Sequence, residues 1–179
     1  MHVAALNLHE WHEFYLLLGT VAGALVALLF VAVSIGVGYL TDERSSATRF
    51  FLSPIVVHFS SVILISALAL APEKFPLLIE ALIAANAIAG FIVAAVVFVR
   101  VWRSHFPGVV VVDHFAYGLT PLASYAVIFA AAVCAAYGWE WSAFLLAAGV
   151  LLLLFVNIRN AWDMMLALVR RAGETHSES

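Results

Sequence analysis

Five long apolar stretches, separated by short polar segments, dominate the pattern of the chain. They cover about residues 14–40, 47–71, 77–102, 115–137 and 142–168. Apolar runs of about 18 or more residues are typical of transmembrane helices, because about 20 helical residues cross the hydrocarbon core of a bilayer. The pattern therefore predicts an all-α integral membrane bundle of five transmembrane helices.

The segments between these stretches contain residues that favour turns. Residues 72–76 (Pro-Glu-Lys-Phe-Pro) and 138–141 (Gly-Trp-Glu-Trp) predict tight turns, since proline and glycine interrupt helices. Residues 103–114 form the longest connection, and within it residues 108–112 fit a loop, a short strand or the start of the fourth helix. Residues 169–179 predict a polar tail without regular structure.

Composition narrows the class of protein. Hydrophobic residues make up 65% of the chain and charged residues 11%, whereas about a quarter of the residues are charged in soluble domains. We expect residues 1–168 to form a single domain. The net charge of −3 argues against nucleic acid as a partner. Cys134 is the only cysteine, so the chain cannot form a disulfide within itself. The first 14 residues contain no Lys or Arg, whereas a secretory signal begins with such residues, so we do not expect one here.

The cations predict how the helices are oriented. Seven arginines fall on one side of the predicted helices and the single lysine, Lys74, on the other. The side rich in Lys and Arg is cytoplasmic, which predicts an N-terminus outside the cytoplasm and a cytoplasmic C-terminus. Tryptophans favour the membrane interface, and all five lie near predicted helix ends. The arginines are Arg44, Arg49, Arg100, Arg103, Arg159, Arg170 and Arg171, and the tryptophans are Trp11, Trp102, Trp139, Trp141 and Trp162.

Two polar residues lie deep within predicted helices. His58 is near the middle of the second helix, with Pro54 and Ser61 on its face, and Asn86 lies at a similar depth in the third. A polar side chain in hydrocarbon must face protein or water, which makes His58 a functional candidate. We expect it to pair with Asn86, either as a structural hydrogen bond or as part of a path for protons or ions. No second histidine lies at this depth, so the sequence does not support a bis-histidine haem.

The cytoplasmic end of the last helix carries four polar residues, Asn157, Arg159, Asn160 and Asp163. At about 100° per residue they form one polar stripe, and Arg159 and Asp163 have the i, i+4 spacing of an ion pair. Two interpretations follow. The helix leaves the membrane here with Arg159 reaching the interface, or the stripe lines the cytoplasmic mouth of a pathway or ligand site.

Two further patterns are less specific. Gly19, Gly23 and Ala27 recur every fourth position in the first helix and predict close helix packing, within one subunit or between subunits. His9, His12 and Glu13 make a weak candidate site for zinc or another divalent metal. His105, Asp113 and His114 are equally weak candidates on the cytoplasmic side. We predict no other cofactor.

The first helix reads Leu18-Gly-Thr-Val-Ala-Gly-Ala-Leu-Val-Ala-Leu-Leu-Phe-Val-Ala-Val-Ser34, and the last contains Asn160-Ala-Trp-Asp163. The chain resembles a family of small, uncharacterised bacterial multi-pass inner-membrane proteins. In these, a Gly/Ala-rich first span ends in Leu-Phe-Val-Ala-Val-Ser and the last span carries Asn-Ala-Trp-Asp. The resemblance implies the bacterial inner membrane as location and assigns no function and no residue roles.

Three classes of function remain open. The first is a homo-oligomeric channel-like or transport-related protein for ions, protons or a small solute. The second is a non-transporting scaffold or regulatory subunit that binds another membrane protein. The third is a metal-binding or redox membrane protein. The sequence contains no Ser-His-Asp order, phosphate-binding loop or Cys/His cluster, which weighs against an enzyme.

Overall fold

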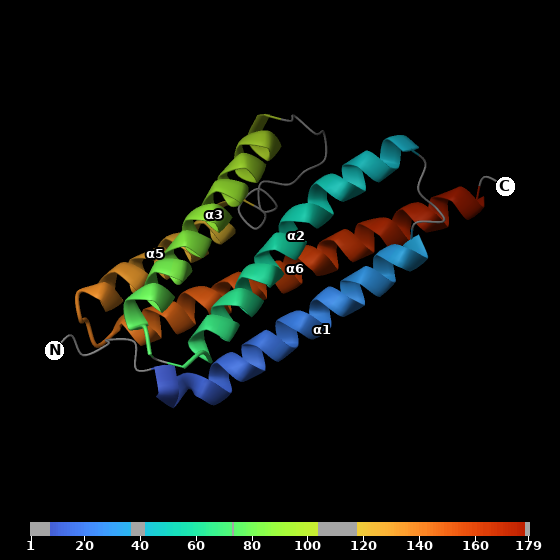
Figure 1. The fold of residues 1–179 in the computed structure, drawn as a ribbon. Helices are drawn as coiled ribbons and strands as arrows, with labels where there is room; N and C mark the ends of the chain where they lie inside the picture. The colour runs from blue at the N-terminus through green and yellow to red at the C-terminus, as the bar shows by residue number, and fades with distance from the viewer. Residues whose placement is uncertain (1–7, 37–41, 73, 104–117, 178–179) are drawn as a thin grey trace.

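The computed structural model describes residues 8–36, 42–72, 74–103 and 118–177. Within these ranges the regular structure is entirely helical, which confirms the all-α prediction. A short 3-10 helix, η1 (Leu8–Trp11), precedes five α-helices in the described ranges. These are α1 (His12–Gly36), α2 (Asp42–Ala69), α3 (Pro76–Arg103), α5 (Thr120–Ala136) and α6 (Ser142–Ser177), as Figure 1 shows.

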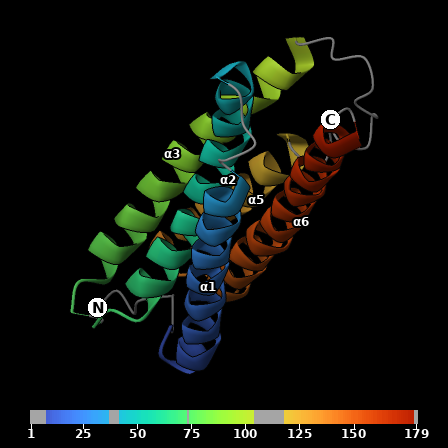
Figure 2. The ribbon, with the colours of Figure 1, turned by 90° about the vertical axis from the view of Figure 1, so that its right-hand side faces the viewer.

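Successive helices run in opposite directions along one bundle. Helix α1 packs against α2 and α6, and α3 packs against α2 and α5. Helix α5 packs closely on α6, and α2 also contacts α6. The turned view in Figure 2 shows α1 in front of the bundle, with α3 and α6 on opposite sides of it. Because α2 touches α1, α3 and α6, its side chains line the interior on several sides.

The up-and-down course of the chain separates the cations. The starts of α1, α3 and α6 lie at one end of the bundle together with the ends of α2 and α5 (Figure 1). We call this the lysine end, because Lys74 lies in its α2–α3 turn. Toward the opposite end, which we call the arginine end, lie the positions of the seven arginines in α2, α3 and α6, of which Arg159 is near the middle of α6.

Length and composition identify membrane-spanning helices. The segments His12–Ser34, Pro76–Arg100 and Ser142–Leu166 are each long and apolar enough to cross a membrane. Pro54–Ala69 and Thr120–Ala136 are apolar but shorter. Large apolar side chains such as Phe30, Ile92 and Phe155 are exposed on the outside of the bundle, where lipid would cover them. These features support a multi-pass membrane protein.

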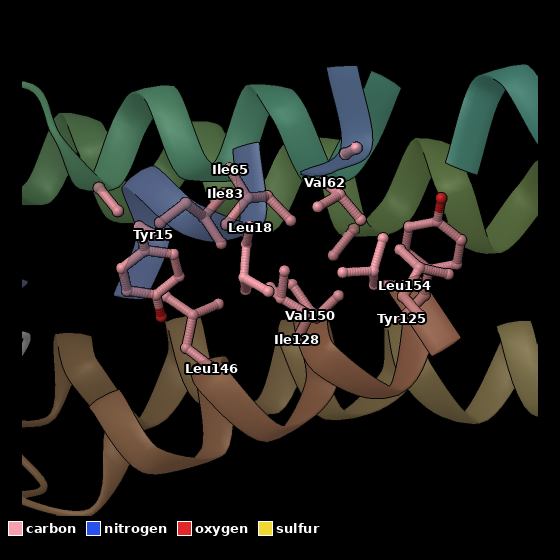
Figure 3. Close-up of a cluster of buried hydrophobic side chains, with 14 of the residues drawn as sticks. Tyr15, Leu18, Val62, Ile65, Ile83, Tyr125, Ile128, Leu146, Val150 and Leu154 are labelled. Atoms are coloured by element: carbon pink, nitrogen blue, oxygen red, sulfur yellow. The ribbon is translucent and has the colours of Figure 1, made fainter. Parts of the chain in front are cut away.

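A layer of aliphatic side chains fills the middle of the bundle. In Figure 3, Tyr15 and Tyr125 lie toward opposite ends of the drawn cluster, and the labelled Leu, Ile and Val side chains occupy the space between them. Ile65, Ile83 and Val150 in this layer are fully buried. Close packing of such side chains holds membrane helices together through dispersion contacts, since lipid removes most of the hydrophobic driving force.

Both predicted tight turns are present. Gly138, two residues after the last residue of α5, has a φ of 79°, and the Trp139 N–H donates to the Cys134 carbonyl at 3.0 Å. This is the geometry of a helix cap that favours glycine. At the other turn α3 begins at Pro76, whose fixed φ suits the first position of a helix.

The predicted boundaries differ from the observed ones at the C-terminus. Helix α6 continues through the polar segment to Ser177, so the prediction that residues 169–179 lack regular structure is wrong as far as Ser177. Good helix formers such as Leu, Ala and Arg run through residues 166–172 and favour this continuation. Residues 37–41 and 104–117 lie outside the described residues, and so do the three alternatives for residues 108–112.

Candidate functional site

A cluster of three hydrogen-bonded side chains lies inside the bundle. His58 Nδ1 lies 2.9 Å from the hydroxyl oxygen of Tyr125, and the same hydroxyl lies 3.0 Å from Ser61 Oγ. All three residues are buried. We call His58, Ser61 and Tyr125 the central polar cluster.

Two helices supply these side chains and a third makes room for them. His58 and Ser61 are three residues apart and therefore share one face of α2. Tyr125 extends from α5, and its ring packs directly on Gly90 of α3. A Cβ atom at Gly90 would overlap Cε1 and Cζ of that ring. The missing side chain of Gly90 thus permits Tyr125 to reach α2.

The chemistry of the three groups allows two hydrogen-bond arrangements. Each hydroxyl has one proton to donate, and the imidazole nitrogen can donate or accept according to its tautomer. In one arrangement His58 donates to Tyr125 and Tyr125 donates to Ser61. In the other Ser61 donates to Tyr125 and Tyr125 donates to His58. The heavy atoms occupy the same positions in both.

The predicted pairing of His58 with Asn86 is wrong, because Tyr125 provides the partner of Nδ1. Asn86 lies one turn before Gly90 on the same face of α3. Its side-chain oxygen is buried and has no hydrogen-bond partner among the described residues. Sequence reasoning missed Tyr125, although a tyrosine in the middle of an apolar helix is itself a signal, since buried phenols need a partner.

The polar stripe of α6 divides into a buried and an exposed half. Asn157 and Asn160 are buried, whereas the side chains of Arg159 and Asp163 are 51% and 36% exposed. Arg159 Nε and Asp163 Oδ2 lie 3.7 Å apart, which matches the predicted ion pair. Four polar side chains therefore do not line one cavity, because two of them face the interior and two face outward.

Asn157 connects α6 to the region of the central polar cluster. Its side-chain amide donates to the backbone carbonyl of Ile55 at 2.8 Å. Ile55 precedes His58 by three residues and lies one turn closer to the arginine end on α2. Asn157 Oδ1 is buried without a hydrogen-bond partner in the part of the chain that the structure describes.

Further polar residues are buried nearer the lysine end, and the sequence analysis did not single them out. Glu80 on α3 is 5% exposed, and Ser66 on α2 and Tyr15 on α1 are buried as well. The hydroxyls of Tyr15 and Ser66 have no partner within the described ranges. Glu80 lies in the first turns of an apolar helix. A carboxylate within a predicted membrane-spanning helix is rare, and on that ground the sequence could have identified Glu80 as a candidate.

The glycine pattern of α1 has two different environments. A Cβ at Gly19 would lie 3.1 Å from Cβ of Ser66, so this position packs tightly on α2. At Gly23 no described atom lies within 4 Å of such a Cβ, and Ala27 is exposed. Of the three small residues, Gly19 therefore packs on α2 within the subunit, whereas Gly23 and Ala27 lie on an open face of α1.

The weak metal candidates do not assemble within the described residues. The side chains of His12 and Glu13 are exposed, and that of His9 lies outside what the structure describes. Position 9 belongs to η1 rather than α1, so the α-helical i, i+4 relation to Glu13 does not apply. His105, Asp113 and His114 lie outside the described residues. In the described ranges no three His, Cys, Asp or Glu residues gather into a possible metal site.

Comparison with known proteins adds no assignment to this geometry. No protein-family model, no curated protein and no solved structure matches the chain. The candidate site therefore rests on its own residues.

Proposed function

We propose that the protein is a homo-oligomeric, channel-like or transport-related membrane protein that passes protons, ions or a small solute. The observation that carries the proposal is the series of buried polar side chains along the bundle. It begins with Glu80 near the lysine end, continues through His58 and Tyr125, and extends to Asn157 toward the arginine end. Ionisable and polar groups inside a membrane bundle are costly, and they mark pathways or binding sites.

In this proposal all five described α-helices cross the inner membrane of a bacterium, with the N-terminus outside and the C-terminus in the cytoplasm. The orientation is supported by the arginines, whose positions lie toward one end of the bundle, and by Lys74 at the other end. The bacterial location is supported by the resemblance of the first and last helices to small inner-membrane proteins.

The proposed pathway is closed in the arrangement described. Aliphatic side chains, among them the buried Val62 and Ile65 of α2, fill the bundle on the lysine-end side of Tyr125. A hydrated ion does not cross such a layer unless side chains or helices move. We therefore expect transport to depend on a conformational change or on thermal opening of this layer.

Self-association belongs to the same proposal. A bundle of five helices is small for enclosing a wide pathway alone, and the face of α1 at Gly23 and Ala27 is open to a second helix. Small residues allow close approach between membrane helices. Native mass spectrometry in detergent would give the number of subunits, and a monomer at all concentrations would remove this part of the proposal.

Flux into liposomes tests the function directly. Purified protein is reconstituted, and fluxes of protons, Na⁺, K⁺ and a small neutral solute are followed over a series of pH values and voltages. We expect flux above that of protein-free liposomes, and we expect His58→Ala to reduce it. Thr20→Ala is the matched control, because Thr20 is exposed and its hydroxyl donates to the Leu16 carbonyl of its own helix. Absence of every flux across the whole series would contradict the proposal.

A non-transporting scaffold or regulatory subunit is the second candidate. Dense packing of the interior favours it, since Ile83, Ile128 and Leu153 are fully buried between the helices. In that case His58 serves the stability of the bundle alone. Stable co-purification with one membrane protein, together with a His58→Ala variant of lower stability and no measurable flux in either form, would favour this alternative.

A further inference from the structure

We propose that the species that passes through the central polar cluster is the proton, and that Tyr125 relays it between His58 and Ser61. The inference rests on the proposed function and names the substrate of that site. Its basis is that each of the three side chains can both donate and accept hydrogen bonds, and that Tyr125 bridges the other two directly.

The geometry fits a proton and excludes a hydrated ion at this level of the bundle. The distances of 2.9 and 3.0 Å join side chain to side chain, so nothing lies between the groups. Tyr125 is 0% exposed and its ring is packed on Gly90. An ion with its hydration shell would require this packing to open, whereas a proton needs only the existing hydrogen bonds.

One transfer moves a single proton from the His58 side of the cluster to the Ser61 side. His58 begins neutral with its proton on Nδ1, and a proton from water on the His58 side binds Nε2 to form the imidazolium. The Nδ1–H bond then breaks as its proton bonds to the Tyr125 oxygen. The original phenolic proton passes to Ser61 Oγ, and the original hydroxyl proton of Ser61 leaves to a water molecule that enters when the aliphatic layer opens. One proton has moved, and no electrons have been exchanged.

After the transfer the hydrogen bonds have the opposite direction. Before the next cycle the two hydroxyls must rotate, and the imidazole must release the proton on Nε2 and take up one on Nδ1 through water on the His58 side. The two arrangements of the hydrogen bonds use the same heavy-atom positions of the three side chains. Gly90 is a positioning residue in this scheme, because it fixes where the Tyr125 hydroxyl lies and takes no part in the transfer itself.

Matched tyrosine variants test the relay. Tyr125→Phe removes the bridging hydroxyl, and Tyr15→Phe removes a buried hydroxyl that has no partner among the described residues. Proton uptake into liposomes is driven by a K⁺ diffusion potential set with valinomycin and followed with a pH-sensitive dye. We expect Tyr125→Phe to lower proton flux at least about tenfold and Tyr15→Phe to leave it within about twofold.

Ser61 provides a second test that does not depend on Tyr125. Ser61→Thr keeps a hydroxyl and should retain proton flux, whereas Ser61→Ala should lose it. Thermal unfolding of each variant in detergent identifies any that fail to fold. Retained flux in folded Tyr125→Phe, or equal flux in Ser61→Ala and Ser61→Thr, would overturn the relay. Rapid passage of Na⁺ or K⁺ would overturn it while leaving the proposed function standing, and no flux of any species would overturn both.

Discussion

The ring of Tyr125 occupies the space that a side chain at Gly90 would need. A Cβ at position 90 would overlap two ring carbons and approach the hydroxyl within 2.7 Å. The contact joins α3 to α5, and it places the hydroxyl of Tyr125 between His58 and Ser61 of α2. The absence of a side chain at Gly90 therefore leaves the space in which the Tyr125 ring reaches the central polar cluster.

We expect Gly90→Ala to destabilise the protein by about 1–3 kcal/mol, because overpacking forces side chains out of their rotamers. The displaced phenol would also lose its bonds to α2. Unfolding in mixed detergent micelles measures the change. The matched control is Gly23→Ala, where the added methyl meets no described atom within 4 Å. Equal stability of the two variants would contradict the packing argument.

The two buried tyrosines should respond in opposite ways to loss of their hydroxyls. Tyr125→Phe leaves His58 Nδ1 and Ser61 Oγ without their shared partner, which should cost about 1 kcal/mol. Tyr15→Phe removes a hydroxyl that has no partner in the described ranges, so stability should stay the same or rise. Parallel unfolding curves compare them, and a larger loss for Tyr15→Phe would contradict the assignment of hydrogen bonds.

The fold was largely predictable because a membrane imposes strong local rules. Long apolar runs, two turns with Gly or Pro and the placement of cations predicted the helices and their alternation. The end of α6 was not predicted correctly. The polar composition after Leu168 fits a disordered tail as well as a helix that continues beyond the membrane. The helix formers in residues 166–172 favour the second outcome, but the polarity of the segment outweighed them in the prediction.

The site was less predictable, since it depends on how helices rotate against each other. His58 and Asn157 were found because polar groups are rare in apolar helices. The partner of His58 depends on Gly90, and no spacing within one helix indicates that Tyr125 of another helix will pack on that glycine. The outward rotation of Arg159 and Asp163 likewise follows from packing of α6 on its neighbours.

The two halves of the α6 polar stripe should differ in their effect on stability. Asn157→Ala removes the buried bond to the Ile55 carbonyl and should cost about 1–3 kcal/mol. Arg159→Ala and Asp163→Ala break an exposed ion pair and should each change stability by about 0–1 kcal/mol. The free energy of unfolding of each variant is measured at low and high salt. Salt should change the effect of the Arg159 and Asp163 substitutions but not that of Asn157→Ala, because only the exposed ion pair is screened. A salt-dependent effect at Asn157 would contradict its assignment.

A second glycine contact should control the packing of α5 on α6. A Cβ at Gly149 would lie 2.8 Å from Cγ1 of Ile128 and 3.2 Å from the backbone nitrogen of Ile128. We expect Gly149→Ala to destabilise by about 1–3 kcal/mol. Ile128→Ala alone leaves a cavity, but combined with Gly149→Ala it should recover part of the loss, and a double-mutant cycle measures this coupling. Purely additive effects would show that the two residues do not compete for space.

The proposed orientation can be tested with the single lysine of the chain. Lys74 is exposed in the α2–α3 turn at the lysine end, and the orientation puts this turn outside the cytoplasm. A membrane-impermeant amine reagent applied to intact spheroplasts should therefore modify Lys74, with the peptide identified by mass spectrometry. Lys74→Arg keeps the charge but removes the reactive amine, which makes it the matched control. Modification that appears only after the membrane is permeabilised would reverse the orientation and place the seven arginines outside, against the usual distribution of positive charge.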